Sequence, residues 1–244
     1  MMDQYLKKAC FWMAFFVFCT TNTDAQTPGL GTWNVATGRY TINTKWNVFF
    51  ETQLRSQQAY HHFNYQEYKG GIGYNFPKKI SLVAAMGHYT TYQPDGDFKS
   101  PVINSEFRLW QQLILNNYLS RVKLEHRYRF EQRFTSSGYR NRFRYRLNAI
   151  IPINKPIVEN NTWYLSFSNE IFLSNRGNFF EQNRLSVLVG YDINDLLTVQ
   201  TGLVNRFDYF GLGKEQWKNF LQTTLLFSFN EGKSGRERHP SQVD

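Results

Sequence analysis

The sequence predicts an all-β fold: an antiparallel up-and-down transmembrane β-barrel of about 10–12 strands with a polar lumen. Three observations predict it. Charged and apolar residues alternate with a period of two, which is typical of strands with one polar and one apolar face. Most alternating segments exceed the roughly 5–6 residues of soluble strands. Aromatic residues make up 18% of the chain, and many lie on the apolar parity near segment ends, where they would suit the aromatic girdles of a membrane barrel.

Residues 1–25 are predicted to be a secretory signal peptide. Two lysines precede an apolar run at residues 10–19, and Thr23 and Ala25 take the small-residue positions of a cleavage site before Gln26. The run is too short to span a membrane. Both cysteines of the chain lie in it, so the mature chain is expected to form no disulfide and no thiolate metal site.

Residues 26–229 are predicted to form the barrel, and residues 230–244 a polar, flexible tail without periodicity. The barrel region divides into eleven alternating segments, and none of it has a helical pattern. Because bacterial barrels normally have an even number of strands, residues 31–42 would not be a full wall strand, or one segment is missed or split. The segments are 31–41, 45–56, 64–76, 79–92, 102–115, 118–134, 139–152, 162–173, 181–192, 196–209 and 217–229.

The strongest alternation is a charge ladder in residues 121–134 and 139–151, which together hold nine of the 28 Lys and Arg. On a helix these charges would surround the axis and leave no apolar stripe. We therefore assign the ladder to the polar face of neighbouring strands, which would line the lumen. Its predicted members are Arg121, Lys123, Glu125, Arg127, Arg129, Glu131, Arg133, Arg140, Arg142, Arg144 and Arg146, with Glu106 and Glu170 on other strands.

Alternation alone does not say which face is inside, because a soluble barrel or sandwich would bury the apolar face instead. Segment length favours the membrane, since a tilted membrane strand needs roughly 9–11 residues for the hydrocarbon alone. The connections also alternate between tight turns and longer loops, as in outer-membrane barrels. The tight turns are predicted at 42–45, 76–79, 116–118 and 192–195 and the loops at 93–101, 174–180 and 210–216, while 153–161 is longer than a tight turn.

Several stretches resemble a known family: TWNVATGRYTINTKWNVFFETQLR (32–55), LEHRYRFEQRF (124–134), YRNRFRYRL (139–147) and FLQTTLLFSF (220–229). They are similar to an uncharacterised outer-membrane barrel family known as domain of unknown function 2490. The resemblance covers about residues 30–229, nearly the whole predicted mature chain. It implies an outer-membrane location and a barrel, but no reaction. A membrane barrel often ends on an aromatic residue, whereas here Phe229 is followed by the tail.

Chemical motifs are sparse, and the sequence predicts no catalytic residue, no cofactor and no metal site. The adjacent His61 and His62 are expected in a loop, and the acidic turn at 95–97 lacks the further oxygen ligands of a calcium loop. His88 and His126 share the apolar parity and should face outward. No G-x-S-x-G motif occurs, and no Ser and His pair at alternate positions on one strand.

The charge ladder itself has two interpretations. Arginine forks bind phosphate or carboxylate in a bidentate way, so the ladder could attract anions. Alternatively, Arg and Glu on neighbouring strands pair with each other and fill the interior of a small barrel. We favour the second, because carboxylates share the parity of the arginines: Glu51, Glu67, Glu106, Glu125, Glu131 and Glu170.

The predicted function is that of an outer-membrane barrel of a Gram-negative cell, exported by its signal peptide. It would be structural or a passive narrow pore for anions or small solutes. The expected partners are outer-membrane lipid and the barrel-assembly machinery, and no oligomeric state is predicted. Nucleic acid is not expected, because the basic residues alternate with apolar ones instead of forming an exposed patch. The alternatives are an outer-membrane lipid-modifying enzyme and a soluble periplasmic ligand-binding barrel or sandwich.

Overall fold

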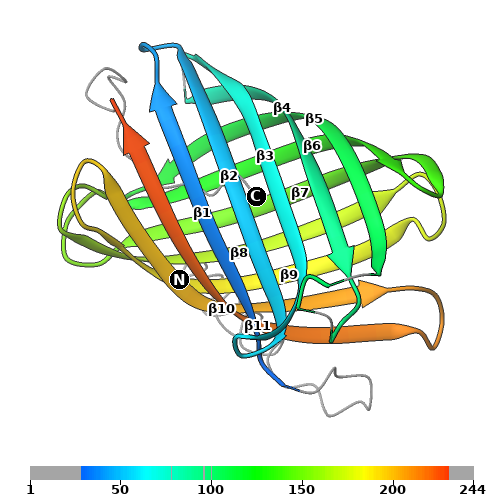
Figure 1. Cartoon of the computed structure of the whole chain (residues 1–244). Helices are drawn as coiled ribbons and strands as arrows, with labels where there is room; N and C mark the ends of the chain where they lie inside the picture. Colours follow the sequence, from blue (N-terminus) through cyan, green and yellow to red (C-terminus); the bar gives the residue numbers. More distant parts are fainter. Residues whose placement is uncertain (1–28, 78, 96, 100, 231–244) are drawn as a thin grey trace, which may run out of the picture.

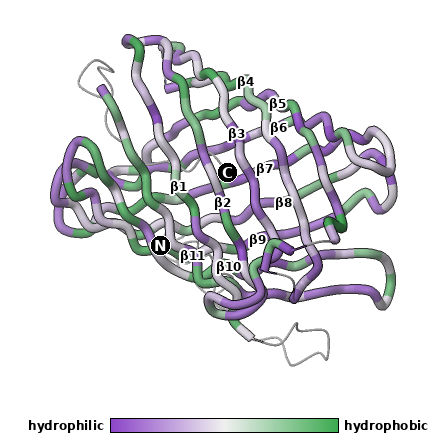
Figure 2. The backbone as a smooth tube through the Cα atoms, viewed as in Figure 1, coloured by the Kyte–Doolittle hydropathy of each residue, from purple (hydrophilic) through white to green (hydrophobic). Residues whose placement is uncertain are grey.

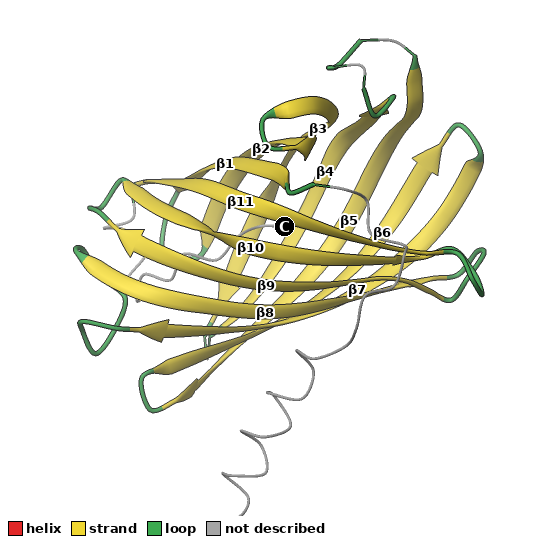
Figure 3. Ribbon diagram, turned by 90° about the horizontal axis from the view of Figure 1, so that it is seen from below, coloured by secondary structure: helices red, strands yellow, loops and turns green. Residues whose placement is uncertain are grey.

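The computed structural model describes residues 29–77, 79–95, 97–99 and 101–230, so the predicted signal peptide and residues 231–244 of the tail lie outside it. The described chain folds into one closed barrel of eleven strands without a helix (Figures 1 and 3). The strands are β1 (Gly31–Thr41), β2 (Trp46–Gln58), β3 (His61–Phe76), β4 (Ile80–Tyr92), β5 (Val102–Leu119), β6 (Val122–Thr135), β7 (Gly138–Pro152), β8 (Thr162–Ser174), β9 (Phe180–Asp192), β10 (Leu197–Tyr209) and β11 (Glu215–Phe229). This confirms the predicted all-β barrel.

The seam between the first and last strands is parallel. Consecutive strands pair in antiparallel fashion around the barrel, but β1 pairs with β11 in parallel, from Gly31↔Phe220 to Tyr40↔Phe229. With an odd number of strands, the first and the last run in the same direction, so only a parallel pairing can close the sheet. The expectation that residues 31–42 are not a full wall strand, or that a segment is missed or split, is therefore wrong.

The two ends of the barrel differ. We call the end with the connections after β1, β3, β5, β7 and β9 the turn rim, and the opposite end the loop rim. The described chain enters at the loop rim and leaves at the turn rim (Figure 1). Two local predictions are wrong: residues 116–118 belong to β5, and His61 and His62 begin β3. In both places the strand continues beyond the polar residues that suggested a turn.

The outer surface of the barrel is an apolar belt. Figure 2 shows hydrophobic and hydrophilic positions interleaved along the strands. Away from the two rims, the outward-facing positions of the described strands contain no Asp, Glu, Lys or Arg. Monomeric soluble proteins rarely expose so large an apolar surface. Its exposed side chains include Val48, Phe50, Ile72, Leu82, Met86, Phe107, Phe130, Phe143, Leu147, Phe167, Val189, Leu203 and Leu225.

Aromatic pairs mark both edges of this belt. At the turn rim, the ring centroids of Trp46 and Tyr74 lie 4.7 Å apart, and those of Trp163 and Tyr191 lie 4.5 Å apart. Near the loop rim, the ring centroids of Phe207 and Trp217 are separated by 4.5 Å. Two aromatic girdles around an apolar band are the pattern of membrane barrels.

The inner surface combines charged side chains with small aromatic clusters. One cluster contains Phe49, Ala85, Tyr89 and Trp110, and a second contains Trp33, Val35, Val204 and Phe220. The third joins Ile150 and Tyr164 to Val158, which the connection after β7 folds into the barrel mouth. Bulky apolar side chains therefore fill much of the interior space that the charged side chains do not occupy.

Gly190 is required for the packing of Tyr164. A Cβ atom at Gly190 would lie 2.1 Å from the Tyr164 ring, whose hydroxyl accepts a 2.6 Å hydrogen bond from Gln200 Nε2. Gly190→Ala should therefore destabilise the barrel by roughly 1–3 kcal/mol, the usual cost of overpacking. Urea unfolding in detergent micelles measures this. Gly38→Ala is the control, because its nearest contact would be an ordinary 3.8 Å; equal stability of both variants would contradict the prediction.

Candidate functional site in the barrel interior

The inward faces of β5–β8 carry most of the predicted charge ladder. Strand alternation directs these side chains into the barrel, where each is at most 7% exposed: Glu106, Lys123, Glu125, Arg127, Arg129, Glu131, Arg133, Arg142, Arg144, Arg146 and Glu170. The two other members lie elsewhere. Arg121 is in the exposed turn after β5, and Arg140 lies near the loop rim, where it forms a 2.7 Å ion pair with Glu181.

Glu131 on β6 is a hub of this network. Its carboxylate lies 2.7 Å from Arg142 Nη2 and 2.7 Å from Arg144 Nη1. Arg129 Nη1 and Arg108 Nη1 follow at 3.5 and 4.0 Å. A carboxylate with no exposed surface thus contacts four guanidinium groups, and it compensates charges that would otherwise be buried without a counter-ion.

Glu170 on β8 is the second hub. Arg144 donates to both of its oxygens, from Nε at 2.9 Å and from Nη2 at 3.0 Å. Arg127 Nη2 donates at 2.7 Å from β6, across the intervening β7. Bidentate guanidinium–carboxylate pairs are strong and geometrically specific. Glu131 and Glu170 together hold four inward arginines of β6 and β7 in place: Arg127, Arg129, Arg142 and Arg144.

The ladder continues toward both rims. Glu106 accepts from Arg133 and, at 2.8 Å, from Arg108. Glu125 accepts from Arg146 at 2.9 Å, and Lys123 Nζ lies 3.6 Å from it. A separate set on β2 and β3 joins Glu51, Lys69, Glu67 and Arg55. Side-chain pairing within the wall thus accounts for the carboxylates of the ladder.

Positive charge nevertheless exceeds negative charge on this wall. Eight inward cations of β5–β8 (Arg108, Lys123, Arg127, Arg129, Arg133, Arg142, Arg144 and Arg146) face four carboxylates (Glu106, Glu125, Glu131 and Glu170). Aromatic rings provide further partners: Arg108 lies 3.7 Å from the centroid of Tyr89, and Arg129 lies 5.2 Å from that of Trp110. Cation–π contacts help to stabilise desolvated guanidinium groups.

A stack of guanidinium groups and rings crosses the interior, and we call it the septum. It consists of Arg55, Trp33, Arg184, Phe172 and Arg144, from β2, β1, β9, β8 and β7. Successive guanidinium-to-centroid distances are 3.5, 4.9, 4.5 and 4.5 Å. The Trp33–Arg184 contact joins strands that β10 and β11 separate in the wall. The septum therefore bridges the lumen from one side to the other.

Sequence reasoning missed the septum. Trp33 and Arg184 are inward by parity, which the alternation could have indicated. Nothing in the sequence pairs them, because β1 and β9 approach each other only through the closed interior. An inward aromatic residue on an otherwise polar face is the one available signal, and Trp33, Tyr89, Trp110, Tyr164 and Phe172 all show it.

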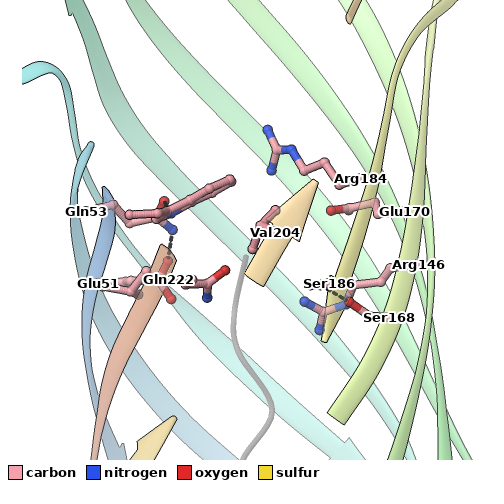
Figure 4. Close-up of a pocket in the computed structure, with 11 residues that line it drawn as sticks. Glu51, Gln53, Arg146, Ser168, Glu170, Arg184, Ser186, Val204 and Gln222 are labelled. Atoms are coloured by element: carbon pink, nitrogen blue, oxygen red, sulfur yellow. Dashed lines mark hydrogen bonds between the residues drawn. The ribbon is translucent and has the colours of Figure 1, made fainter. Parts of the chain in front are cut away.

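Beside the septum lies a small polar cavity. Figure 4 shows Glu51 and Gln53 on one side and Arg146, Glu170 and Arg184 on the facing strands. Its volume of about 30 Å³ has room for about two water molecules. This cavity by itself is too small for a solute much larger than water.

On the outer surface, a serine and a histidine lie side by side. Ser105 Oγ on β5 is 3.1 Å from His88 Nε2 on β4, and Thr90 Oγ1 is 3.4 Å from His88 Nδ1. The prediction that both histidines face outward agrees with the structure, and His126 Nδ1 lies 2.9 Å from the hydroxyl of Tyr145. The search along single strands missed the Ser105–His88 pair, because sheet pairing brings the two residues together diagonally across neighbouring strands.

The described residues contain no cluster of three or more His, Cys, Asp or Glu side chains arranged to hold a metal ion. No helix in the same part of the chain is long and apolar enough to cross a membrane.

Comparison with known families places the chain. A family model described as "Protein of unknown function (DUF2490)" matches residues 30–217. The chain belongs to the DUF2490 family. The match confirms the resemblance seen in the sequence, and it covers the barrel from before β1 to the start of β11. No significant match was found among curated proteins or among solved structures. The DUF2490 family carries no assigned activity, so function must be argued from the barrel itself.

Proposed function

We propose that this DUF2490 protein is an outer-membrane β-barrel of the Gram-negative type with a lumen closed by its own side chains. It would serve as a structural wall element rather than as an open porin. The uncharged outer belt and the two aromatic girdles support the membrane placement. The proposed partners are outer-membrane lipid along the belt and the assembly machinery during insertion.

The septum is the observation that carries the closed-lumen proposal. Water-filled porins use about 16–18 strands, and eleven strands enclose a narrower interior. Here ion-paired arginines and stacked rings occupy that interior, with Arg127, Arg129 and Arg144 each at most 2% exposed. Solute passage would require these side chains to move. The excess of cations means that any such passage would favour anions.

Flotation with liposomes tests the membrane placement. The purified chain, refolded with phosphatidylcholine liposomes, should float with them in a density gradient and stay bound after carbonate extraction. It should also aggregate when detergent is removed without lipid. A soluble periplasmic barrel or sandwich would instead remain monodisperse in plain buffer and stay at the bottom of the gradient. That result would overturn the proposal.

The Ser105–His88 pair favours a second candidate function, a lipid-ester hydrolase at the membrane surface. A nucleophile, a base and a third group that orients the base are the parts such chemistry needs. Among the described residues, the one hydrogen-bonding contact of Ser105 Oγ is to His88. Such a hydrolase would also need an oxyanion hole, a set of donors to the developing negative charge. Phospholipid hydrolysis by the reconstituted protein, lost in Ser105→Ala and kept in Ser228→Ala, would support the hydrolase. If the wild type and both variants leave the phospholipid unhydrolysed, the hydrolase function is excluded.

A further inference from the structure

The turn rim holds a pocket that the closed-lumen proposal does not use. It has a volume of about 490 Å³, within the range of roughly 300–1,000 Å³ found for small-molecule sites. The turn after β5 and the start of β6 form one side of it. The connection after β7 (residues 153–161) forms the other side.

The first side of the pocket is cationic. Lys79, Arg121 and Lys123 line it, together with the hydroxyl-bearing Tyr118 and Ser120, and no carboxylate is among its lining residues. Lys79 Nζ lies 3.4 Å from the centroid of the Tyr118 ring. In the described part of the chain, no carboxylate lies within ion-pair distance of Lys79 or Arg121. Lys123 is buried, and its Nζ lies 3.6 Å from Glu125.

The second side of the pocket is apolar. Ile150, Ile157 and Val158 line it; Ile150 and Val158 are buried, while Ile157 is 44% exposed. An apolar ligand group that covers the exposed part of Ile157 would remove apolar surface from water, which favours binding.

This apolar side is held in place by its own connection. Asn154 Oδ1 accepts from the Trp163 backbone N–H at 2.8 Å, and Asn154 Nδ2 donates to the Asn161 carbonyl at 2.9 Å. A 2.9 Å ion pair joins Lys155 to Glu159. The pocket is thus formed before any ligand arrives, which lowers the entropic cost of binding.

We propose that this turn-rim pocket binds an amphipathic anion, with a carboxylate or phosphate head on an apolar chain. The head lies against Lys79 and Arg121, and the apolar tail of the ligand lies against Ile157 and Val158. Lys79 and Arg121, which have no carboxylate within ion-pair distance among the described residues, select the anionic head. The apolar side selects the apolar tail of the ligand. The inference rests on the rim geometry alone and does not depend on whether the lumen conducts.

Isothermal titration of the full chain in phosphatidylcholine nanodiscs tests the proposal, with empty nanodiscs as the blank. Decanoate and decyl phosphate should bind, whereas decanol, acetate and inorganic phosphate should bind about tenfold more weakly or not at all. The double variant Lys79→Gln/Arg121→Gln should weaken decanoate binding by about tenfold or more, because charge-assisted hydrogen bonds are lost. Lys45→Gln removes an exposed cation from another turn of the same rim and should leave binding unchanged.

Two results would overturn the proposal: equal binding of decanol and decanoate, or equal decanoate binding by the double variant and the Lys45 control. Nanodiscs that contain phosphatidylglycerol identify the source of the anion. Competition by that lipid points to an occupant from the bilayer, and undiminished decanoate binding points to a free amphipathic anion. Ile157→Asn should lower decanoate affinity more than acetate affinity. This separates the contribution of the ligand's apolar tail from that of its anionic head.

Discussion

Replacing Glu131 with glutamine should destabilise the barrel by about 3–5 kcal/mol, the range expected when one partner of a buried ion pair is removed. Glutamine keeps the size and the hydrogen-bonding capacity of the side chain but removes its charge. Arg142, Arg144 and Arg129 would then lose their shared counter-ion. Equilibrium unfolding in urea, followed by tryptophan fluorescence in micelles, measures the loss.

The exposed pair of Lys155 and Glu159 provides the control for this experiment. Glu159→Gln breaks an ion pair of 2.9 Å whose side chains are 31% and 51% exposed, so it should cost no more than about 1 kcal/mol. Adding Arg142→Met to Glu131→Gln should restore part of the lost stability, because it removes a buried charge whose remaining carboxylate partner, Glu181, lies 3.6 Å away. If Glu131→Gln were as mild as the control, the network would not be the stabilising feature proposed here.

Tyr128→Arg should also have a large effect, and in this case the membrane is the cause. Tyr128 is 36% exposed on the outer face of β6, in the apolar belt. An arginine there would face lipid at a cost of roughly 2–4 kcal/mol near the midplane, whereas near an interface the same residue costs roughly 0–1 kcal/mol. The folded yield in liposomes, read from heat-modifiable electrophoretic mobility, should fall sharply.

Tyr139→Arg is a matched control at the loop rim. Tyr139 also faces outward and is 48% exposed. Each substitution removes one aromatic contact: the ring centroid of Tyr128 lies 5.0 Å from that of Tyr145, and the ring centroid of Tyr139 lies 5.2 Å from that of Phe134. The two substitutions therefore differ mainly in depth. A soluble barrel would tolerate both equally, since both arginines would reach water. Equal and mild effects would contradict the assignment of the outer face to lipid.

The eleven strands and their faces could be predicted because period-two alternation is a local property of the chain. Glu131 and Arg129 fall on one parity, and Tyr128 and Phe130 fall on the other, in the sequence as in the barrel. Strand ends do not follow from alternation, because a polar run such as residues 116–118 suits either a turn or a strand. In the structure the turn lies at residues 120–121 instead, so Arg121 is in the turn and not in the charge ladder.

Contacts across the interior could not be predicted in this way. The parallel seam follows from the strand count, but the expectation of an even number argued against it. The septum depends on the curvature of the barrel. This curvature brings Trp33 on β1 close to Arg184 on β9, although β10 and β11 separate the two strands in the wall. The turn-rim pocket depends on how residues 153–161 fold over the mouth. The septum and the pocket are both formed by residues far apart in the sequence, so local alternation does not indicate them.

Single-channel recording in planar bilayers tests the central claim of a closed lumen most directly. The wild-type protein should insert without steady current. The double variant Trp33→Ala/Phe172→Ala, which removes both rings of the septum, should show a measurable and anion-preferring current. A steady anion-selective current through the wild type, lost when Arg127, Arg129, Arg142 and Arg144 are neutralised, would contradict the closed lumen and make the charge ladder the filter of a pore.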